Sequence, residues 1–437
     1  MLKILISALI CGLIFNWGET LFFILFVSFI LLLNKPSTLE HCYMNLEFDY
    51  FSWALTLLSL WIVALSMISS TDNVNSSKKS KFYLFIMVCM LISLSFTFTI
   101  SNMATFYLLF ETCLIPILII ILGWGYQPER MQAGVYLLFY TIFGSLPLLI
   151  IILQAIKLSG SGYMFFTPFF LTGTMSAFCL FAAFLVKFPM YGVHLWLLKA
   201  HVEAPVAGSM ILAGVLLKLG GFGLIRVFSL LDSSYYLMKE LVISISVWGG
   251  VLVSVNCLRY TDMKLLIASS SVVHMSTCVA GLFIMTEWGV KGCLMMMLAH
   301  GVCSSGLFFL ANSVYQRTNS RSMLVSKGLL NLAPMMSLCW FLLLAANMAA
   351  PPTINLGSEI MLLISLISWS HTVIPLLILL TFFSVTYSVY LFSLSQHGVF
   401  NKSKSALTHN SSLEYLNVFL HWIPLNALIL NMMFMSC

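Results

Sequence analysis

The chain has 437 residues, of which 61% are hydrophobic and only 8% are charged, and its formal net charge is +6. Soluble domains carry about 25% charged residues, so this composition excludes a water-soluble protein and predicts an all-α chain that crosses a bilayer many times. The positive charge forms no basic patch interleaved with aromatic residues, and no glycine-rich phosphate loop is present. We therefore expect the lipid bilayer as a partner, and neither nucleic acid nor bound nucleotide.

About fourteen apolar stretches are long enough, or nearly long enough, to form transmembrane helices. In chain order they cover residues 4–15, 19–33, 51–69, 82–101, 104–123, 131–156, 165–200, 206–230, 239–257, 263–285, 290–314, 329–369, 372–394 and 415–434. The first stretch is short and resembles a signal peptide. It lacks a small-residue cleavage site and runs into a second apolar stretch, so we expect it to remain as a helix.

Two of these stretches contain prolines that predict a broken helix. The seventh holds KFPMYG at residues 187–192, and the twelfth holds AAPPTINLG at residues 349–357. Proline inside a helix removes a hydrogen bond and clashes with the preceding turn. Both stretches are also longer than one span requires, so we expect an interruption in each.

The positions of the two breaks predict two inverted repeats. Helices four to eight and nine to thirteen form two five-helix units, and each unit has its break on its fourth helix. Because five is an odd number, the second unit enters the membrane from the opposite side, an arrangement found in many transporters. A single kinked helix is common in membrane proteins, whereas two broken helices at equivalent positions of two units are less common. The expected domains are N-terminal helices at 1–81, repeats at 82–230 and 231–394, and a C-terminal loop and helix at 395–437.

The distribution of lysine and arginine predicts the orientation in the membrane. Twelve of these residues follow odd-numbered helices: Lys78, Lys79, Lys81, Arg130, Lys199, Arg259, Lys264, Arg317, Arg321, Lys327, Lys402 and Lys404. Four follow even-numbered helices: Lys35, Lys157, Lys239 and Lys291. This bias places the odd-numbered loops on the inner side, so both termini are expected on the outer side.

Ionisable residues inside the predicted helices are the candidate site. A charge near the bilayer centre costs about 2.5–3.5 kcal/mol on insertion scales, so such residues usually have a function. Each one alone could be structural, because a buried histidine often only bonds two helices and a charge near a helix end, such as Arg226, can snorkel. The six candidates are Glu111, Lys187, Lys218, His274, His300 and Glu359.

Proton transfer is the chemistry that these residue types favour. Desolvation disfavours the charged form of a lysine and a nearby carboxylate favours it, so the separation of Glu111 and Lys187 would control the proton on Lys187. The other four candidates would extend the relay, with water between them. Sodium transport is the rival use, but it favours clustered carboxylates and carbonyls over lysines. A helix break beside Lys187, and another beside Glu359, would supply polar groups and room for water.

Metal binding is a weaker alternative. His194, His201 and Glu203 lie close in sequence, but their spacing is not HExxH and no thiolate accompanies them. Most cysteines lie inside apolar runs without a CxxC pair, so we expect buried thiols rather than disulfides or iron–sulfur ligands.

Several long motifs resemble those of one family, the antiporter-like subunit 4 of NADH dehydrogenase in respiratory complex I. They occur in family order between about residues 100 and 360: FETCLIPILIIILGWGYQPER, LLFYTIFGSLPLLI, KFPMYGVHLW, WLLKAHVEAPVAGSMILAGVLLKLGGFGLIRV, CLRYTDMKLLIASSSVVHMS, MLAHGVCSSGLFFLANSVYQRTNSR and LAPMMSLCWFLLLAANMAAPPTINLGSE. QPER and PPTINLGSE are similar to the animal mitochondrial form. Leu198 stands where the family usually has proline, and the N-terminal region is shorter than in vertebrate forms.

The resemblance implies a proton-translocating module of complex I in the mitochondrial inner membrane, with both termini on the intermembrane-space side. By position, the family's relay residues fall on the same six residues that the burial argument selects. No cofactor is expected in this chain, because NADH, FMN, iron–sulfur clusters and ubiquinone belong to other subunits. The expected partners are other membrane-arm subunits, including neighbouring antiporter-like ones. Two alternatives remain open: a subunit of the related multisubunit cation/proton antiporters, and a structural scaffold with inert charges.

Overall fold

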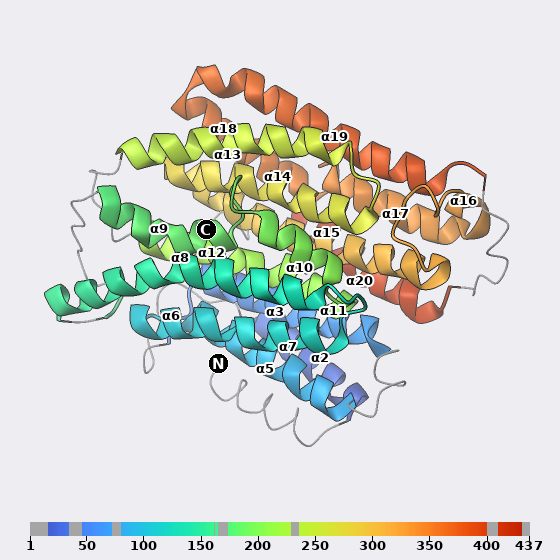
Figure 1. The fold of residues 1–437 in the computed structure, drawn as a ribbon, viewed down its shortest axis with the longest axis horizontal. Coiled ribbons are helices and arrows are strands. Elements are labelled where there is room, and N and C mark those ends of the chain that lie inside the picture. The colour runs from blue at the N-terminus through green and yellow to red at the C-terminus, as the bar shows by residue number, and fades with distance from the viewer. Residues whose placement is uncertain are drawn as a thin grey trace. The chain divides into compact units, whose positions relative to one another are not determined.

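Helices make up almost all of the regular structure in this computed structural model of the chain (Figure 1). It describes residues 16–34, 46–71, 80–160, 162–164, 174–228, 236–399 and 410–430. Within these ranges the only strand-like features are isolated β-bridges, such as that between Leu46 and Ile100. The expectation of an all-α fold is confirmed for this part of the chain.

The described helices divide between two compact units. Unit 1 comprises Met1–Phe188 and Glu203–Glu240. Its helices are α2 (Trp17–Leu33), α3 (Tyr50–Ser69), α5 (Ser80–Thr99), α6 (Met103–Thr112), α7 (Leu114–Trp124), α8 (Arg130–Ser159), α9 (Thr174–Lys187), α11 (Val206–Ile211), the π-helix η1 (Leu212–Leu216) and α12 (Leu217–Phe228).

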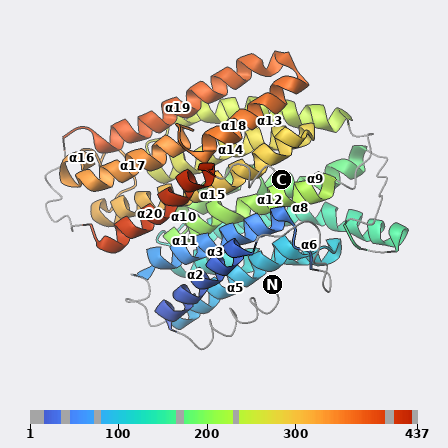
Figure 2. The same ribbon diagram turned by 180° about the vertical axis from the view of Figure 1, so that it is seen from behind.

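Unit 2 comprises Pro189–Val202 and Leu241–Cys437. It holds most of α10 (Leu195–Glu203) and most of α13 (Tyr236–Cys257). It holds all of α14 (Met263–Ile284), α15 (Glu287–Thr318), α16 (Leu329–Leu332), α17 (Pro334–Asn347), α18 (Ile354–Trp369), the 3-10 helix η3 (His371–Val373), α19 (Ile374–Gln396) and α20 (Ser412–Ala427). Figure 2 shows the same helices from behind.

Ten helical segments within the described ranges are long and apolar enough to cross a membrane. From the second onwards, each predicted stretch coincides, within the described residues, with one helix or with two or three consecutive helices. The first, at residues 4–15, lies outside the described residues. The chain is thus a multi-span membrane protein, while the count of fourteen helices and the inverted repeats stay predictions.

Both predicted interruptions are present. α9 ends at Lys187 and α10 begins at Leu195, with turns and irregular backbone between them. α17 ends at Asn347 and α18 begins at Ile354. The start of the twelfth stretch differs from the prediction, because α16 is a separate short turn and Pro334 opens α17, the first-turn position that proline tolerates best.

Two further irregularities were not predicted. The fifth stretch is interrupted at Cys113, between α6 and α7. Pro116 explains this, because it has no N–H for the carbonyl of Thr112 and its ring crowds that carbonyl. The eighth stretch contains the π-helix η1, in which the backbone N–H of Leu217 donates to the carbonyl of Leu212, five residues earlier.

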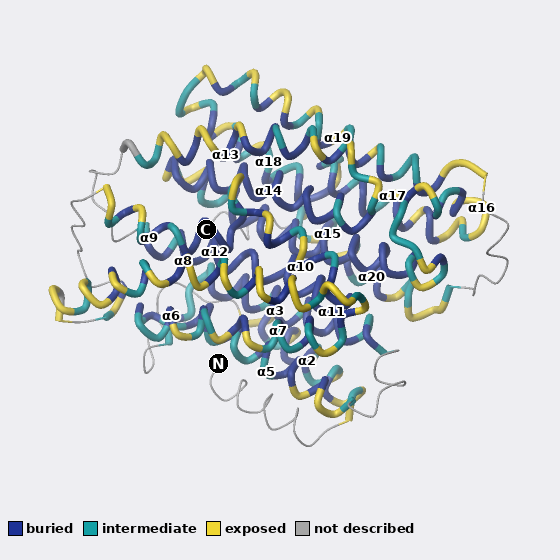
Figure 3. The backbone as a smooth tube through the Cα atoms, viewed as in Figure 1, coloured by how far each residue is buried: buried dark blue, intermediate teal, exposed yellow. Residues whose placement is uncertain are grey.

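Glycines set the spacing of the core helices in unit 2. A Cβ at Gly292 of α15 would lie 2.9 Å from the Cβ of Met361 on α18, and a Cβ at Gly289 would collide with the carbonyl of Gly281 on α14. The α15 backbone therefore lies directly against its neighbours. α15 is buried along its apolar length, whereas only about a third of the apolar length of α19 is buried (Figure 3).

Candidate functional site

Lys187 is the last residue of α9 and is buried. Its Nζ donates a hydrogen bond of 2.5 Å to the carbonyl oxygen of Phe110 and lies 3.0 Å from the centroid of the Phe110 ring. Phe110 belongs to the last turn of α6, where carbonyls have no intrahelical donor. The helix end at Cys113 therefore supplies Lys187 with a backbone acceptor, and the aromatic face adds a cation–π contact.

Glu111 follows Phe110 directly, so the structure brings it into the neighbourhood of Lys187. Among the ion pairs of the described residues, none within 4.0 Å joins these two side chains. The Oε1 atom of Glu111 is buried and has no hydrogen-bond partner among the described residues. The two charges are thus neighbours without direct contact, which leaves room for a change in their separation.

Lys218 is the second residue after the π-helix and is fully buried. Its Nζ donates a hydrogen bond to the carbonyl oxygen of Ala213 within the π-helix. In a regular α-helix the N–H of Leu217 would take this carbonyl, but here that N–H donates to Leu212. The wider turn therefore frees the acceptor that Lys218 uses, in line with the frequent occurrence of π-bulges at functional sites.

Arg226 does not need the snorkelling that its position near a helix end suggested. Its Nη1 lies 2.6 Å from Oδ2 of Asp49, which precedes α3, and its side chain is only 8% exposed. Its guanidinium also lies 4.9 Å from the ring centroid of Phe222. This ion pair ties the end of α12 to the start of α3, a structural role.

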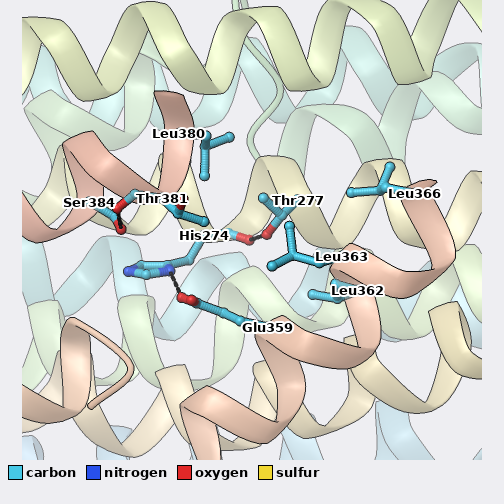
Figure 4. Close-up of a pocket in the computed structure, with 9 residues that line it drawn as sticks. All are labelled: His274, Thr277, Glu359, Leu362, Leu363, Leu366, Leu380, Thr381 and Ser384. Carbon is cyan, nitrogen blue, oxygen red and sulfur yellow. Dashed lines mark hydrogen bonds and ion pairs between the residues drawn. The ribbon is translucent and has the colours of Figure 1, made fainter. Parts of the chain in front are cut away.

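The second group of candidates meets in unit 2 around His274 of α14. The Nδ1 atom of His274 lies 3.6 Å from Oε1 of Glu359 on α18 (Figure 4). Its Nε2 atom lies 3.3 Å from the hydroxyl of Tyr387 on α19. One imidazole is therefore placed between a carboxylate and a phenol, each on a different helix.

His300 of α15 lies beside His274, with 5.6 Å between their ring centroids. His274 and Glu359 also line a cavity of about 20 Å³, together with Thr277, Thr381, Ser384 and several leucines (Figure 4). The surface of this cavity is mostly apolar, because the three hydroxyl groups donate to backbone carbonyls of their own helices. A cavity of this size has room for about one water molecule. The arrangement can pass a proton between neighbouring groups without large movements.

The predicted site residues thus fall into two groups, with Glu111, Lys187 and Lys218 in unit 1 and His274, His300 and Glu359 in unit 2. Sequence reasoning missed Tyr387, although a tyrosine among the serines of SVTYSVY was a readable signal. It also missed the carbonyls of Phe110 and Ala213 as acceptors, because every residue has a backbone carbonyl and the residue type does not show which of them is free. Lys264, counted above as a loop residue, lies in the buried first turn of α14.

The metal alternative finds no support in the geometry. His194 stacks on Tyr191 with 5.6 Å between centroids, and His201 stacks on Phe308 at 4.7 Å. Across the described ranges, no group of three or more His, Cys, Asp or Glu residues could hold a metal ion.

Two family models together match residues 1–386 of the chain. Residues 100–386 match the transmembrane region of the NADH:quinone oxidoreductase/Mrp antiporter family. Residues 1–99 match the amino terminus of NADH-ubiquinone oxidoreductase chain 4.

Curated relatives and solved structures agree with these matches. The chain is 50% identical over 385 residues to NADH-ubiquinone oxidoreductase chain 4 of Ceratitis capitata, covering 88% of this chain and 86% of the relative. It is 45% identical over 417 residues to the chain 4 of Locusta migratoria, covering 94% and 93%. Its fold resembles a chain of respiratory complex I from Thermus thermophilus with a TM-score of 0.85 at 22% identity, over 97% of this chain and 93% of that one.

The fold and the buried ionisable groups define an antiporter-like membrane subunit of the respiratory type. Within this class, the identity levels and the match at the amino terminus decide the family. The chain belongs to the NADH-ubiquinone oxidoreductase chain 4 family.

Proposed function

We propose that this chain translocates protons across the mitochondrial inner membrane as a membrane-arm subunit of complex I, driven by electron transfer from NADH to ubiquinone in other subunits. Family membership supports the assignment to complex I. The observation that carries the proton-relay role is the contact of His274 with Glu359 and Tyr387 beside a water-sized cavity.

In unit 1, Lys187 would hold and release the proton, and Glu111 would control its charge state. The ammonium group donates to the carbonyl of Phe110, which directly precedes Glu111, so a small shift of α6 would change both this hydrogen bond and the separation of Lys187 from Glu111. A carboxylate that approaches a buried lysine favours its charged form, and one that retreats favours release of the proton. Lys218, held by the carbonyl of Ala213, would be the next group in this unit.

In unit 2, His274 would pass protons between His300, Glu359 and the cavity water. Imidazole suits this role because its two nitrogens accept and donate in turn. The two nitrogens of His274 face a carboxylate and a phenol, so uptake at one nitrogen can be matched by release at the other.

The finer architecture is part of the same proposal. The two observed breaks support inverted repeats at residues 82–230 and 231–394 within fourteen helices. The bias of positive charges supports termini on the intermembrane-space side. NADH, FMN, iron–sulfur clusters and ubiquinone would bind in other subunits, and the direct partners would be neighbouring antiporter-like subunits of the membrane arm.

The experiment that tests this function replaces Lys187 by alanine in the assembled complex. We expect quinone reduction and proton uptake to fall together, because the two are coupled. Glu111→Gln should lower both in the same direction. Normal proton pumping by an assembled Lys187→Ala complex would contradict the proposal.

Cation/proton exchange is the second candidate, because the family model that matches residues 100–386 includes Mrp antiporters. Sodium–proton exchange by the purified chain in vesicles, without NADH, would favour it. The match of residues 1–99 to chain 4 ranks the complex I function first. An inert scaffold would instead keep full pumping after all four carboxylates and lysines, Glu111, Lys187, Lys218 and Glu359, are neutralised.

A further inference from the structure

Helix α20 is attached to the rest of unit 2 by contacts along its whole length. Near its start, Glu414 forms an ion pair of 2.5 Å with Arg317 at the end of α15. In its middle, His421 packs so closely on α15 that a Cβ at Gly306 would lie 3.2 Å from the Cβ of His421. Since α15 also carries His300, α20 runs alongside a helix of the candidate site.

The far end of α20 reaches the break between α17 and α18. The Asn426 amide, oriented so that both of its polar groups are paired, donates from Nδ2 to the carbonyl oxygen of Pro352 at 3.1 Å. Its Oδ1 accepts from the indole Nε1 of Trp422, also at 3.1 Å. Trp422 and Asn426 are four residues apart and therefore share one face of α20.

The hydrogen bond from Asn426 pairs a backbone carbonyl in the break between α17 and α18. Backbone groups outside a helix at membrane depth are tolerated only where protein or water satisfies them. Within the break, Ala350 donates to the carbonyl of Ala345 at 2.9 Å, and the side chain of Asn355 donates to Ala346 at 2.5 Å. These contacts tie α17 to α18, whereas Asn426 ties the break to a third helix.

The consequence concerns Glu359. α18 begins two residues after Pro352, and Glu359 lies within its second turn. The distance of 3.6 Å between His274 Nδ1 and Glu359 Oε1 is already long for a direct hydrogen bond. A small displacement of α18 away from α14 would therefore break this contact.

We propose that Asn426 is a positioning residue for Glu359: by binding the Pro352 carbonyl it fixes the break from which α18 starts, and so fixes the distance between Glu359 and His274. This inference rests on the proposed proton relay for its functional consequence. The positions of α20, of the break and of α18 do not depend on that relay.

The test uses assembled complex I in which Asn426 is replaced by leucine, which has the same branching at Cγ and no hydrogen-bonding group in its side chain. The first measurement is a high-resolution map of the variant complex. We expect the Pro352 region to move away from α20, and the His274–Glu359 distance to exceed the present 3.6 Å. An unchanged break and an unchanged distance would overturn the proposal, whatever the activity.

The second measurement is proton pumping in the same complex. We expect a loss of roughly fivefold in pumping, since one net hydrogen bond contributes about 1 kcal/mol. Trp422→Phe keeps the Asn426 donor and removes the indole N–H together with part of the ring. It should give a smaller loss of the same kind, and it serves if the leucine variant fails to assemble. Ile423→Leu, at a 52% exposed neighbour on α20, is the matched control and should change neither measurement.

A double-mutant cycle separates positioning from a merely structural role. If Asn426 acts through Glu359, Asn426→Leu should cause no further loss of pumping in a Glu359→Gln background. A full additional loss there would contradict the proposal. Normal pumping by Glu359→Gln alone would instead contradict the proposed function, and the map would still decide whether Asn426 positions α18.

Discussion

The two units hold their buried ionisable groups in different ways. In unit 1, Lys187 and Lys218 bind backbone carbonyls, those of Phe110 and Ala213. In unit 2, His274 contacts side chains, those of Glu359 and Tyr387. The first unit thus relies on irregular helices to supply acceptors, and the second relies on the choice of side chains on three regular helices.

This difference indicates two ways of keeping a titratable group inside a membrane. A lysine ammonium has only donors, so it needs acceptors that a regular helix does not offer. The end of α6 and the π-helix η1 each release one carbonyl for this purpose. An imidazole has a donor and an acceptor of its own and needs no such change in the backbone.

The largest effect should come from Lys218. Lys218→Met removes one of the proposed proton carriers, and we expect pumping by the assembled complex to fall by roughly a hundredfold, the lower range for a lost proton-transfer group. Lys218→Arg keeps the positive charge but cannot release a proton, so it should be just as inactive. Full pumping by the arginine variant would show that only the charge matters in unit 1.

An intermediate effect is expected in unit 2. Tyr387→Phe removes one hydrogen bond to His274 and leaves the Glu359 contact in place. We expect pumping to fall by roughly fivefold, the equivalent of one hydrogen bond. Proton uptake and quinone reduction measured in one preparation would check this. If Tyr387→Phe were as damaging as Lys218→Met, the phenol would be more than a supporting contact.

A smaller effect should follow from repairing the helix in unit 1. Pro116→Ala restores the missing N–H and allows α6 and α7 to join, so the carbonyl of Phe110 gains a competing intrahelical donor. A carbonyl accepts two hydrogen bonds, so we expect only about a twofold loss of pumping. A map of the variant should show a continuous helix through Cys113. A continuous helix with an unchanged Lys187 contact would refute the role given to this interruption.

The smallest effect is expected for a charge pair outside both groups. Lys291 and Glu287 lie one turn apart on α15, with 3.7 Å between Nζ and Oε2, and Glu287 is 86% exposed. Exposed pairs of this kind contribute roughly 0.3–0.5 kcal/mol. Lys291→Gln should therefore leave pumping and thermal stability of the complex nearly unchanged. A large loss would mean that the relay extends to this end of α15.

The sequence was sufficient to locate most of the described helices and the two helix breaks, but it placed Lys264 in a loop although this residue lies in the buried first turn of α14. Apolar stretches predict helices reliably because the bilayer requires about twenty consecutive apolar residues, and the prolines of KFPMYG and AAPPTINLG marked both breaks. Pro116 is also a proline inside an apolar stretch, but this stretch is no longer than one transmembrane helix requires. Its length therefore gave no second indication of an interruption. The π-helix before Lys218 depends on how neighbouring helices pack, which a single sequence does not reveal.

Partners of the charged groups could not be predicted for a related reason. Tyr387 lies 113 residues from His274, and the contact exists only because α14, α18 and α19 lie together. Asp49 was not considered as a partner for Arg226, because it lies outside the apolar stretches.

The contact of Gly292 with α18 has a consequence for inherited variation. Every other amino acid adds at least a Cβ at this position, 2.9 Å from that of Met361, so any missense change there wedges two helices apart. Such a mutation would leave every ionisable group in the sequence while displacing α18, the helix that carries Glu359, from α15. Pathogenic alleles of this chain should therefore include substitutions at glycines that have no chemistry of their own.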